Sequence, residues 1–273
     1  MKFLKKKTLQ ELDQRKLNSY DILFMVEKEK NFLIENQINN PKIFVINGSP
    51  QIDYMMKQKF PLLKQKLFKI MKINQEKKTI LFLQNSSGVR NISDEMYKNK
   101  LDICEYYKIL KIMINFAEKN NYHIFSKLKS KNISIKKNLN DGKIKNMLKE
   151  VHLNPNVTVI DPSSNILSYD LFFSDIMVIQ SHGTSLIESM IINPKTIQCQ
   201  LSLHHDFSGI KKYNLLPQAN SENELIYWLD VLSKDPNSKI TKPFQKQRKQ
   251  FIQDFYGKVE NSTDKIQKIL FEI

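Results

Sequence analysis

The chain has 273 residues, of which 41% are hydrophobic, and its 43 lysines and arginines against 28 aspartates and glutamates give a net charge of +15. This composition indicates a globular protein of one large or two small domains, and it excludes a membrane-spanning helix because no apolar run approaches about 20 residues. The positive charge predicts an acidic partner, which is nucleic acid, an anionic membrane surface or a phosphorylated substrate.

The basic residues narrow the class of partner, and the cysteines indicate the cellular compartment. The arginines are Arg15, Arg90 and Arg248, whereas readers of DNA bases usually rely on the planar guanidinium group, so we do not expect sequence-specific DNA binding. Cys104 and Cys199 lie far apart without a CxxC spacing, as is typical of reduced cysteines in a cytosolic protein. We therefore expect a cytoplasmic protein whose basic surface allows peripheral contact with the inner face of the membrane.

Short apolar runs alternate with longer helical patterns along the chain. The expected strands are Ile22–Val26, Ile43–Ile46, Thr79–Leu83, Tyr122–Phe125, Val157–Ile160, Ile176–Ile179 and Thr196–Cys199. Strands that alternate with helices indicate an α/β fold, here a Rossmann-like, mostly parallel sheet with helices on both faces.

Several helices are expected between and after these strands. Residues 51–74 follow the turn at Gly48 and are helical and lysine-rich, and residues 103–117 have the spacing of a helix that covers one sheet face. Ser221 and Glu224 have the spacing of a capping box. Two further helices close the chain, and we expect them to pack back on the body of the protein.

The most informative segment is 174–188, where an apolar strand leads into a turn of small residues and the start of a helix. Ser181, Gly183, Thr184 and Ser185 would place backbone amides, hydroxyls and a positive helix end together, which suits a phosphate group. The alternative is an ordinary strand-to-helix turn of an α/β domain. Glu188 lies one helical turn after Thr184, on the same face of the helix, where it would reach a sugar hydroxyl of the ligand. The alternative is an ordinary exposed carboxylate on a helix.

Ligands of an open parallel sheet bind beyond the carboxyl ends of the strands, so the other loops after strands are also candidates. Ser86 and Ser87 follow one strand, and Asp161 and Ser163 follow another. Lys127, in the loop after Phe125, is the candidate for neutralising the charge of a diphosphate. The alternative is that Lys127 is a solvated surface lysine.

Histidine and metal chemistry add one further candidate. His182 precedes the Gly183 turn and is able to donate to a phosphate or to act as an acid or base. His204 and His205 are adjacent in a loop, a spacing that rarely chelates a metal, so we expect no metal site. The sequence has no GxSxG, Walker or GxGxxG motif, which argues against hydrolase, P-loop and dehydrogenase chemistry.

With these residues assembled, the chain resembles the nucleotide-binding half of GT-B-type glycosyltransferases, near CDP-glycerol glycerophosphotransferases, UDP-N-acetylglucosamine 2-epimerases and surface-polysaccharide biosynthesis proteins. Residues 45–53 resemble the Gly-x-Pro-x-x-Asp junction between the two domains, and residues 174–188 with 193–195 form the second match. The resemblance covers roughly residues 20–270. It implies that 1–50 are a remnant of the N-terminal, acceptor-side domain and that 51–273 bind the nucleotide donor.

The resemblance also implies roles for individual residues. Gly183, Thr184 and Ser185 would bind the donor diphosphate, and Glu188 would contact the ribose or the sugar of the donor. Residues 161–164 would lie near the base of the donor. Lys129 stands where the family has the histidine of its Lys-x-His-Pro pattern, so a histidine expected near the donor phosphate is missing.

These implications lead to a functional hypothesis with His182 and Glu188 as catalytic residues and no cofactor besides the donor substrate. The protein would transfer a nucleotide-activated sugar or polyol phosphate in capsule, lipopolysaccharide or teichoic-acid-like polysaccharide biosynthesis. The alternatives are a non-catalytic nucleotide-sugar-binding module that depends on an acceptor-domain partner, a UDP-sugar 2-epimerase-like enzyme, and a lysine-driven nucleic-acid binder.

Overall fold

The computed structural model describes residues 23–25, 43–45, 50–58, 60–84, 95–129, 141–180, 184–201, 214–234, 241–256 and 262–272. The chain divides into two compact units, the smaller formed by Met1–Lys57 with Lys249–Ile273 and the larger by Gln58–Arg248. The functional boundary at residue 50 stays a prediction.

The larger unit contains a six-stranded, entirely parallel sheet with the strand order β5-β4-β3-β6-β7-β8. Its strands are β3 (Lys78–Leu83), β4 (Tyr122–Lys127), β5 (Val157–Ile160), β6 (Ile176–Gln180), β7 (Thr196–Cys199) and β8 (Gln218–Ala219). In the smaller unit, β1 (Leu23–Met25) pairs in parallel with β2 (Ile43–Val45). All seven predicted strands are confirmed, and among the strands that the structure describes only the two-residue β8 had no apolar run to predict it.

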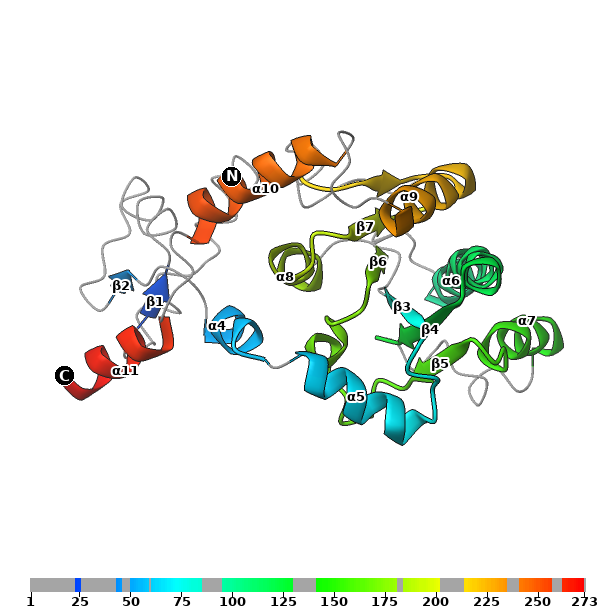
Figure 1. The fold of residues 1–273 in the computed structure, drawn as a ribbon, viewed down its shortest axis with the longest axis horizontal. Coiled ribbons are helices and arrows are strands. Elements are labelled where there is room, and N and C mark those ends of the chain that lie inside the picture. Colours follow the sequence, from blue (N-terminus) through cyan, green and yellow to red (C-terminus); the bar gives the residue numbers. More distant parts are fainter. Residues whose placement is uncertain are drawn as a thin grey trace. The chain divides into compact units, whose positions relative to one another are not determined.

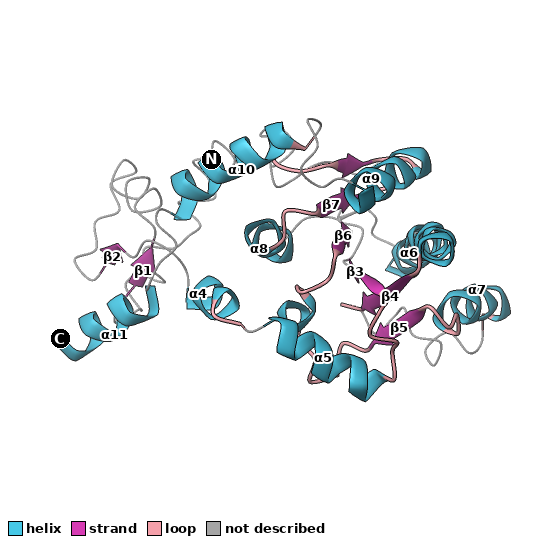
Figure 2. Cartoon of the chain, viewed as in Figure 1, coloured by secondary structure: helices cyan, strands magenta, loops and turns pink. Residues whose placement is uncertain are grey.

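The helices are α4 (Pro50–Met56), α5 (Phe60–Met71), α6 (Glu95–Asn120), α7 (Gly142–His152), the 3-10 helix η3 (Ser168–Leu171), α8 (Thr184–Ile192), α9 (Glu222–Lys234), α10 (Lys242–Tyr256) and α11 (Ser262–Glu272). In the larger unit, α6, α7 and α9 cover one face of the sheet and α5 and α8 the other (Figure 1). This arrangement confirms the predicted Rossmann-like α/β fold, and Figure 2 separates its helices and strands by colour. None of the helices in the described ranges is long and apolar enough to cross a membrane.

Residues 51–74, predicted to be helical, form two helices, because the structure divides this segment into α4 and α5. Pro61 is the second residue of α5. Proline has no backbone N–H and fits the first turn of a helix, whereas in a helix interior it removes a hydrogen bond and collides with the preceding turn. The interruption before α5 follows from this proline.

The side chains of the central strands alternate between two cores. Ile80 and Phe82 face α6, whereas Phe125 points to the opposite side and packs there with aromatic rings from outside the sheet. Phe68 of α5 and Phe173 lie with their ring centroids 6.0 and 5.9 Å from that of Phe125. Because Phe68 is only 1% exposed, this cluster fixes α5 on the sheet.

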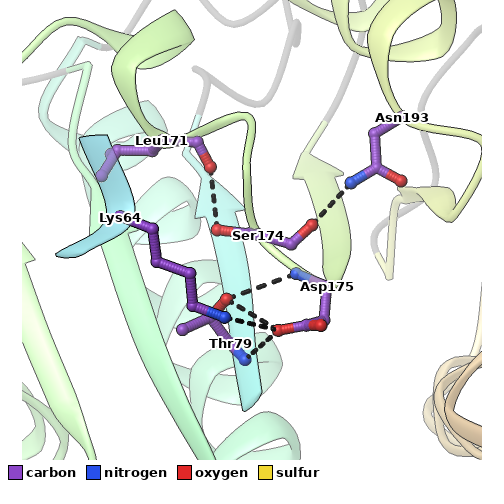
Figure 3. Close-up of polar contacts among 6 residues, drawn as sticks. All are labelled: Lys64, Thr79, Leu171, Ser174, Asp175 and Asn193. Atoms are coloured by element: carbon purple, nitrogen blue, oxygen red, sulfur yellow. Dashed lines mark hydrogen bonds and ion pairs between the residues drawn. The ribbon is translucent and has the colours of Figure 1, made fainter. Parts of the chain in front are cut away.

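Asp175 joins the amino-terminal ends of β3 and β6 (Figure 3). Its Oδ2 atom accepts hydrogen bonds from the backbone N and the Oγ1 of Thr79, at 2.8 and 3.1 Å, and lies 3.6 Å from Nζ of Lys64 on α5. The buried Asn193 donates from Nδ2 to the carbonyl of Ser174 at 2.6 Å. The predicted segment 174–188 therefore begins with a structural clamp, at the opposite end of β6 from the turn proposed to bind phosphate.

In the smaller unit, Asp53 of α4 caps the first turn of α11. Its Oδ2 accepts from the Oγ of Ser262 at 2.6 Å and from the backbone N of Thr263 at 3.0 Å. Burial alone would raise the pKa of Asp53, but the hydrogen bonds from Ser262 and Thr263 outweigh it and lower the pKa below its ordinary value. The aspartate of the Gly-x-Pro-x-x-Asp junction thus connects two helices that are 209 residues apart in sequence.

We expect Asp175→Ala to lower the free energy of unfolding by about 1–3 kcal/mol, because it leaves the buried N–H of Thr79 without its acceptor. The measurement is urea unfolding followed by circular dichroism. Asp230→Ala is the control, because Asp230 makes only an exposed i,i+4 pair with Lys234 and its loss should cost no more than about 0.5 kcal/mol. Equal losses in the two variants would contradict the clamp.

Asp53→Asn should destabilise the protein by about 1–3 kcal/mol at neutral pH, where the carboxylate is charged. Because the folded pKa of Asp53 lies below the unfolded one, its stabilisation is complete above the unfolded value and is lost as pH falls through the folded value. The variant should therefore lose less stability than the wild type between neutral and acidic pH. Urea unfolding across that range measures the difference, and parallel pH curves for the two proteins would refute it.

Candidate functional site

Between β3 and β6 the order in which strands are added to the sheet reverses its direction. From β3 the chain continues to β4 and β5 on one side, and from β6 it continues to β7 and β8 on the other. The chain thus adds strands on opposite sides of the adjacent pair β3 and β6. In doubly wound folds ligands bind at this topological switch point.

A cavity of about 250 Å³ lies at that point. Its walls come from the ends of β3, β4 and β6, the segment after β5, the 3-10 helix and the first turn of α8. The lining residues are Leu83, Gln84, Lys127, Leu128, Lys129, Pro162, Ser168, Ile179, Ser185 and Leu186. Five of these are apolar and five are polar or basic, a mixture that suits a ligand with a flat apolar part and a charged part.

Lys127 is the buried cation of the cavity. We predicted it in a loop, but β4 is longer than expected and Lys127 is its last residue. The side chain is 9% exposed and donates from Nζ to the carbonyl of Asp161 at 3.0 Å. Burial lowers the pKa of Lys127, and the nearby Asp161 and Asp170 carboxylates oppose the change.

Backbone contacts hold the segment after β4 against its neighbours. The buried Gln84 donates from its backbone N to the carbonyl of Lys127 at 3.1 Å, and its Oε1 accepts from the backbone N of Lys129 at 2.9 Å. Leu128 donates from its backbone N to the carbonyl of Ile160 at 3.0 Å. The positions of both cavity lysines are therefore determined by the strands on either side.

Asp161 and Ser163 are exposed and interact with each other rather than lining the cavity. The Oδ1 of Asp161 accepts from the backbone N and the Oγ of Ser163, at 2.8 and 2.5 Å. This local turn is typical of aspartate after a strand. It positions the Asp161 carbonyl against Lys127 and Pro162 at the cavity wall, while the predicted donor contacts of the two side chains stay predictions.

At the start of α8, Ser185 and Leu186 reach the cavity. The helix begins at Thr184, so its first backbone N–H groups and the positive end of its dipole lie on the cavity side. Glu188 follows one turn later, partly buried and outside the set of lining residues, and burial raises its pKa. Its predicted role toward the donor is not tested by this geometry.

Several predicted site residues lie outside the described ranges. These are Ser86, Ser87, Ser181, His182 and Gly183, with the side chain of Thr184. Their assignments stay predictions.

Two of the other histidines, His123 and His152, are part of the core. Burial lowers the pKa of each to about 4, so both are neutral at pH 7. His123 Nε2 lies 2.9 Å from the Oγ1 of Thr158, and His152 Nε2 lies 3.0 Å from the hydroxyl of Tyr106. Across the residues that the structure describes, no cluster of three His, Cys, Asp or Glu side chains is suited to hold a metal ion.

From the sequence we predicted neither Ser168, which lines the cavity, nor Gln180, a buried polar residue outside the lining. Ser168 belongs to the 3-10 helix, and only the tertiary fold brings it to the cavity wall. Gln180 ends β6 and is buried, and neither atom of its amide has a hydrogen-bond partner within the described ranges. The sequence did offer a signal for Gln180, because it is a polar residue at the end of an otherwise apolar strand. An unpaired buried amide costs about 1–3 kcal/mol, which a polar group bound at this strand end would recover.

Comparison with known proteins reveals similarity in structure but not in sequence. No protein-family model and no curated protein sequence matches the chain. The wall teichoic acid polymerase TagF superimposes with a TM-score of 0.56 at 15% identity, over 97% of this chain and 62% of that one. The fold is that of a GT-B half.

Two further structures agree with this fold. A glycosyltransferase from Rickettsia africae matches with a TM-score of 0.50 at 14% identity, over 95% of this chain and 66% of that one. The UDP-GlcNAc 2-epimerase from Neisseria meningitidis matches with a TM-score of 0.52 at 17% identity, over 91% and 60%. The chain thus spans about three fifths of the length of these proteins.

Proposed function

We propose that the protein binds a nucleotide-activated sugar or polyol phosphate in the cavity and transfers the activated group during the synthesis of a cell-surface polysaccharide. The observation that carries this proposal is the largely buried side chain of Lys127, which lines the cavity at the switch point of a Rossmann-like sheet. A buried cation next to an accessible cavity favours an anionic ligand, because the ligand restores the solvation that burial removed.

The diphosphate of the donor fits the polar half of the cavity. An ammonium group has three N–H donors, and Lys127 uses one of them for the Asp161 carbonyl, so two remain for phosphate oxygens. Lys129 supplies a second positive charge, and the start of α8 with Ser185 supplies backbone N–H groups. We propose that Gly183 and Thr184 complete this phosphate site.

The remaining groups of the donor are assigned to the apolar lining and to α8. Leu83, Leu128 and Pro162 offer apolar surface to a nucleobase. Glu188 would bind donor hydroxyls and His182 would assist departure of the leaving phosphate, as the resemblance implies. Burial raises the pKa of Glu188, so its carboxyl group holds a proton more readily than an exposed glutamate does.

Two structural neighbours support the class of donor. One structure of the teichoic acid polymerase TagF contains CDPG, and the epimerase from Neisseria meningitidis is bound to UDP-GlcNAc. TagF is, by its name, a polymerase of wall teichoic acid. A common nucleotide-donor site is the simplest reason for a shared fold around a cavity with this chemistry.

Isothermal titration with UDP-, CDP- and CMP-linked donors is the direct test. We expect one class of donor to bind, and we expect Lys127→Met to weaken its binding by about 10- to 100-fold, the value of a charge-assisted hydrogen bond. Lys145→Met on α7 is the matched control, because Lys145 lies outside the cavity lining and its loss should leave the affinity unchanged.

The absence of binding by every donor, in a sample that circular dichroism shows to be folded, would overturn the proposal. Product analysis then separates the activities. Transfer to an acceptor supports a transferase, whereas inversion at the sugar C2 without transfer would replace it with epimerase chemistry.

Donor affinity should also fall at alkaline pH earlier than an ordinary lysine would allow. Burial lowers the pKa of Lys127, so its positive charge is lost as pH rises through the lowered value. Titrations from neutral to alkaline pH should therefore show a fall in wild-type affinity that is absent from Lys127→Met. An equal fall in both proteins would assign the pH dependence to another group.

A further inference from the structure

The helix α5 divides sharply into a buried face and an exposed face. Leu67 and Phe68 are buried, and Phe68 belongs to the aromatic cluster on the sheet. Lys64 strengthens this attachment, because its Nζ lies 3.6 Å from Asp175. Within α5, the same atom lies 5.3 Å from the centroid of the Phe68 ring. The sheet therefore holds α5 in one orientation and leaves its other face to the surroundings.

That other face combines large apolar side chains with lysines. Leu62 is 61% exposed and Ile70 is 63% exposed, although burying either would be favourable by about 1.5–3 kcal/mol. They are two helical turns apart, and Lys66 and Lys69 lie between them on the same face. We call Leu62, Lys66, Lys69 and Ile70 the outer face of α5.

The charge around the outer face has one sign. Residues 60–78 contain six lysines and one acidic residue, Glu76. Within the described ranges, Lys66 and Lys69 make no ion pair, whereas Lys64 is matched by Asp175. A partner with many negative charges would thus complement this surface.

We propose that the outer face of α5 docks the protein on an anionic phospholipid surface. Leu62 and Ile70 would insert at the boundary between headgroups and acyl chains, and the lysines beside them would contact lipid phosphates. Nucleic acid would use the lysines but would leave the exposed Leu62 and Ile70 without a role. Because α5 packs against η3 and Ser168 of η3 lines the cavity, docking would bring the cavity close to the membrane.

Co-sedimentation of the full chain with lipid vesicles tests this proposal independently of donor binding. We expect binding to vesicles of equal parts phosphatidylcholine and phosphatidylglycerol, and none to phosphatidylcholine alone. Neutralising the two lysines in K66Q/K69Q should weaken binding by roughly 25-fold, since each lysine near an anionic surface contributes about fivefold. L62S/I70S should weaken it by roughly tenfold or more through the loss of inserted apolar surface.

The matched control is K143Q/K149Q, which removes the same charge from exposed positions on α7. It should bind as the wild type does, and thermal melting should show all three variants folded because every changed side chain is exposed. Failure of the wild type to bind anionic vesicles would overturn the proposal. Equal weakening by the α7 control, unchanged binding by L62S/I70S, or a preference for an RNA or DNA oligonucleotide over the vesicles would overturn it as well.

Discussion

The pairing of β3 with β6 is the constraint on which the rest of the larger unit depends. The two strands are far apart in sequence, and the contact between Thr79 and Asp175 spans 96 residues. Such a pairing costs loop-closure entropy, so it needs specific stabilisation at its start. Asp175 provides it by accepting from the first residues of β3, which fixes a register that brings Leu83 opposite Ile179 at the other end. Both of these residues line the cavity.

The burial of Lys127 costs free energy of folding, which suggests that the lysine is retained for a function of the cavity. A methionine would fill the same space without the desolvation penalty of an ammonium group. The structure offsets part of this cost through the Asp161 carbonyl and the charges of Asp161 and Asp170, but the pKa of Lys127 remains lowered. A residual penalty of this kind, at the edge of a cavity, supports the anion site that we propose.

The sequence predicted what depends on local pattern. Apolar, partly β-branched runs such as Val157–Ile160 are recognisable without tertiary context, and parallel strands place their following loops at one edge. The contribution of Ser168 was not predictable, because it depends on how a 3-10 helix packs. Likewise, we did not predict that the Asp161 carboxylate accepts a hydrogen bond from Ser163, two residues away; the role of Asp161 toward the donor stays a prediction. Local hydrogen bonds compete with ligands for the same oxygen atoms.

The lysines show why composition alone gave three classes of partner. Their net charge is one number, yet Lys127 is buried at the cavity, Lys64 is matched by Asp175, and Lys66 faces outward on the same helix as Lys64. These environments are coupled through Asp175, which joins β3 to β6 and also holds α5 on the sheet. Asp175 thus sets the strand register that places the cavity residues, and it also orients the outer face of α5. The proposed ligand site and the proposed docking surface are therefore both positioned by the same sheet. They can act together without a conformational change.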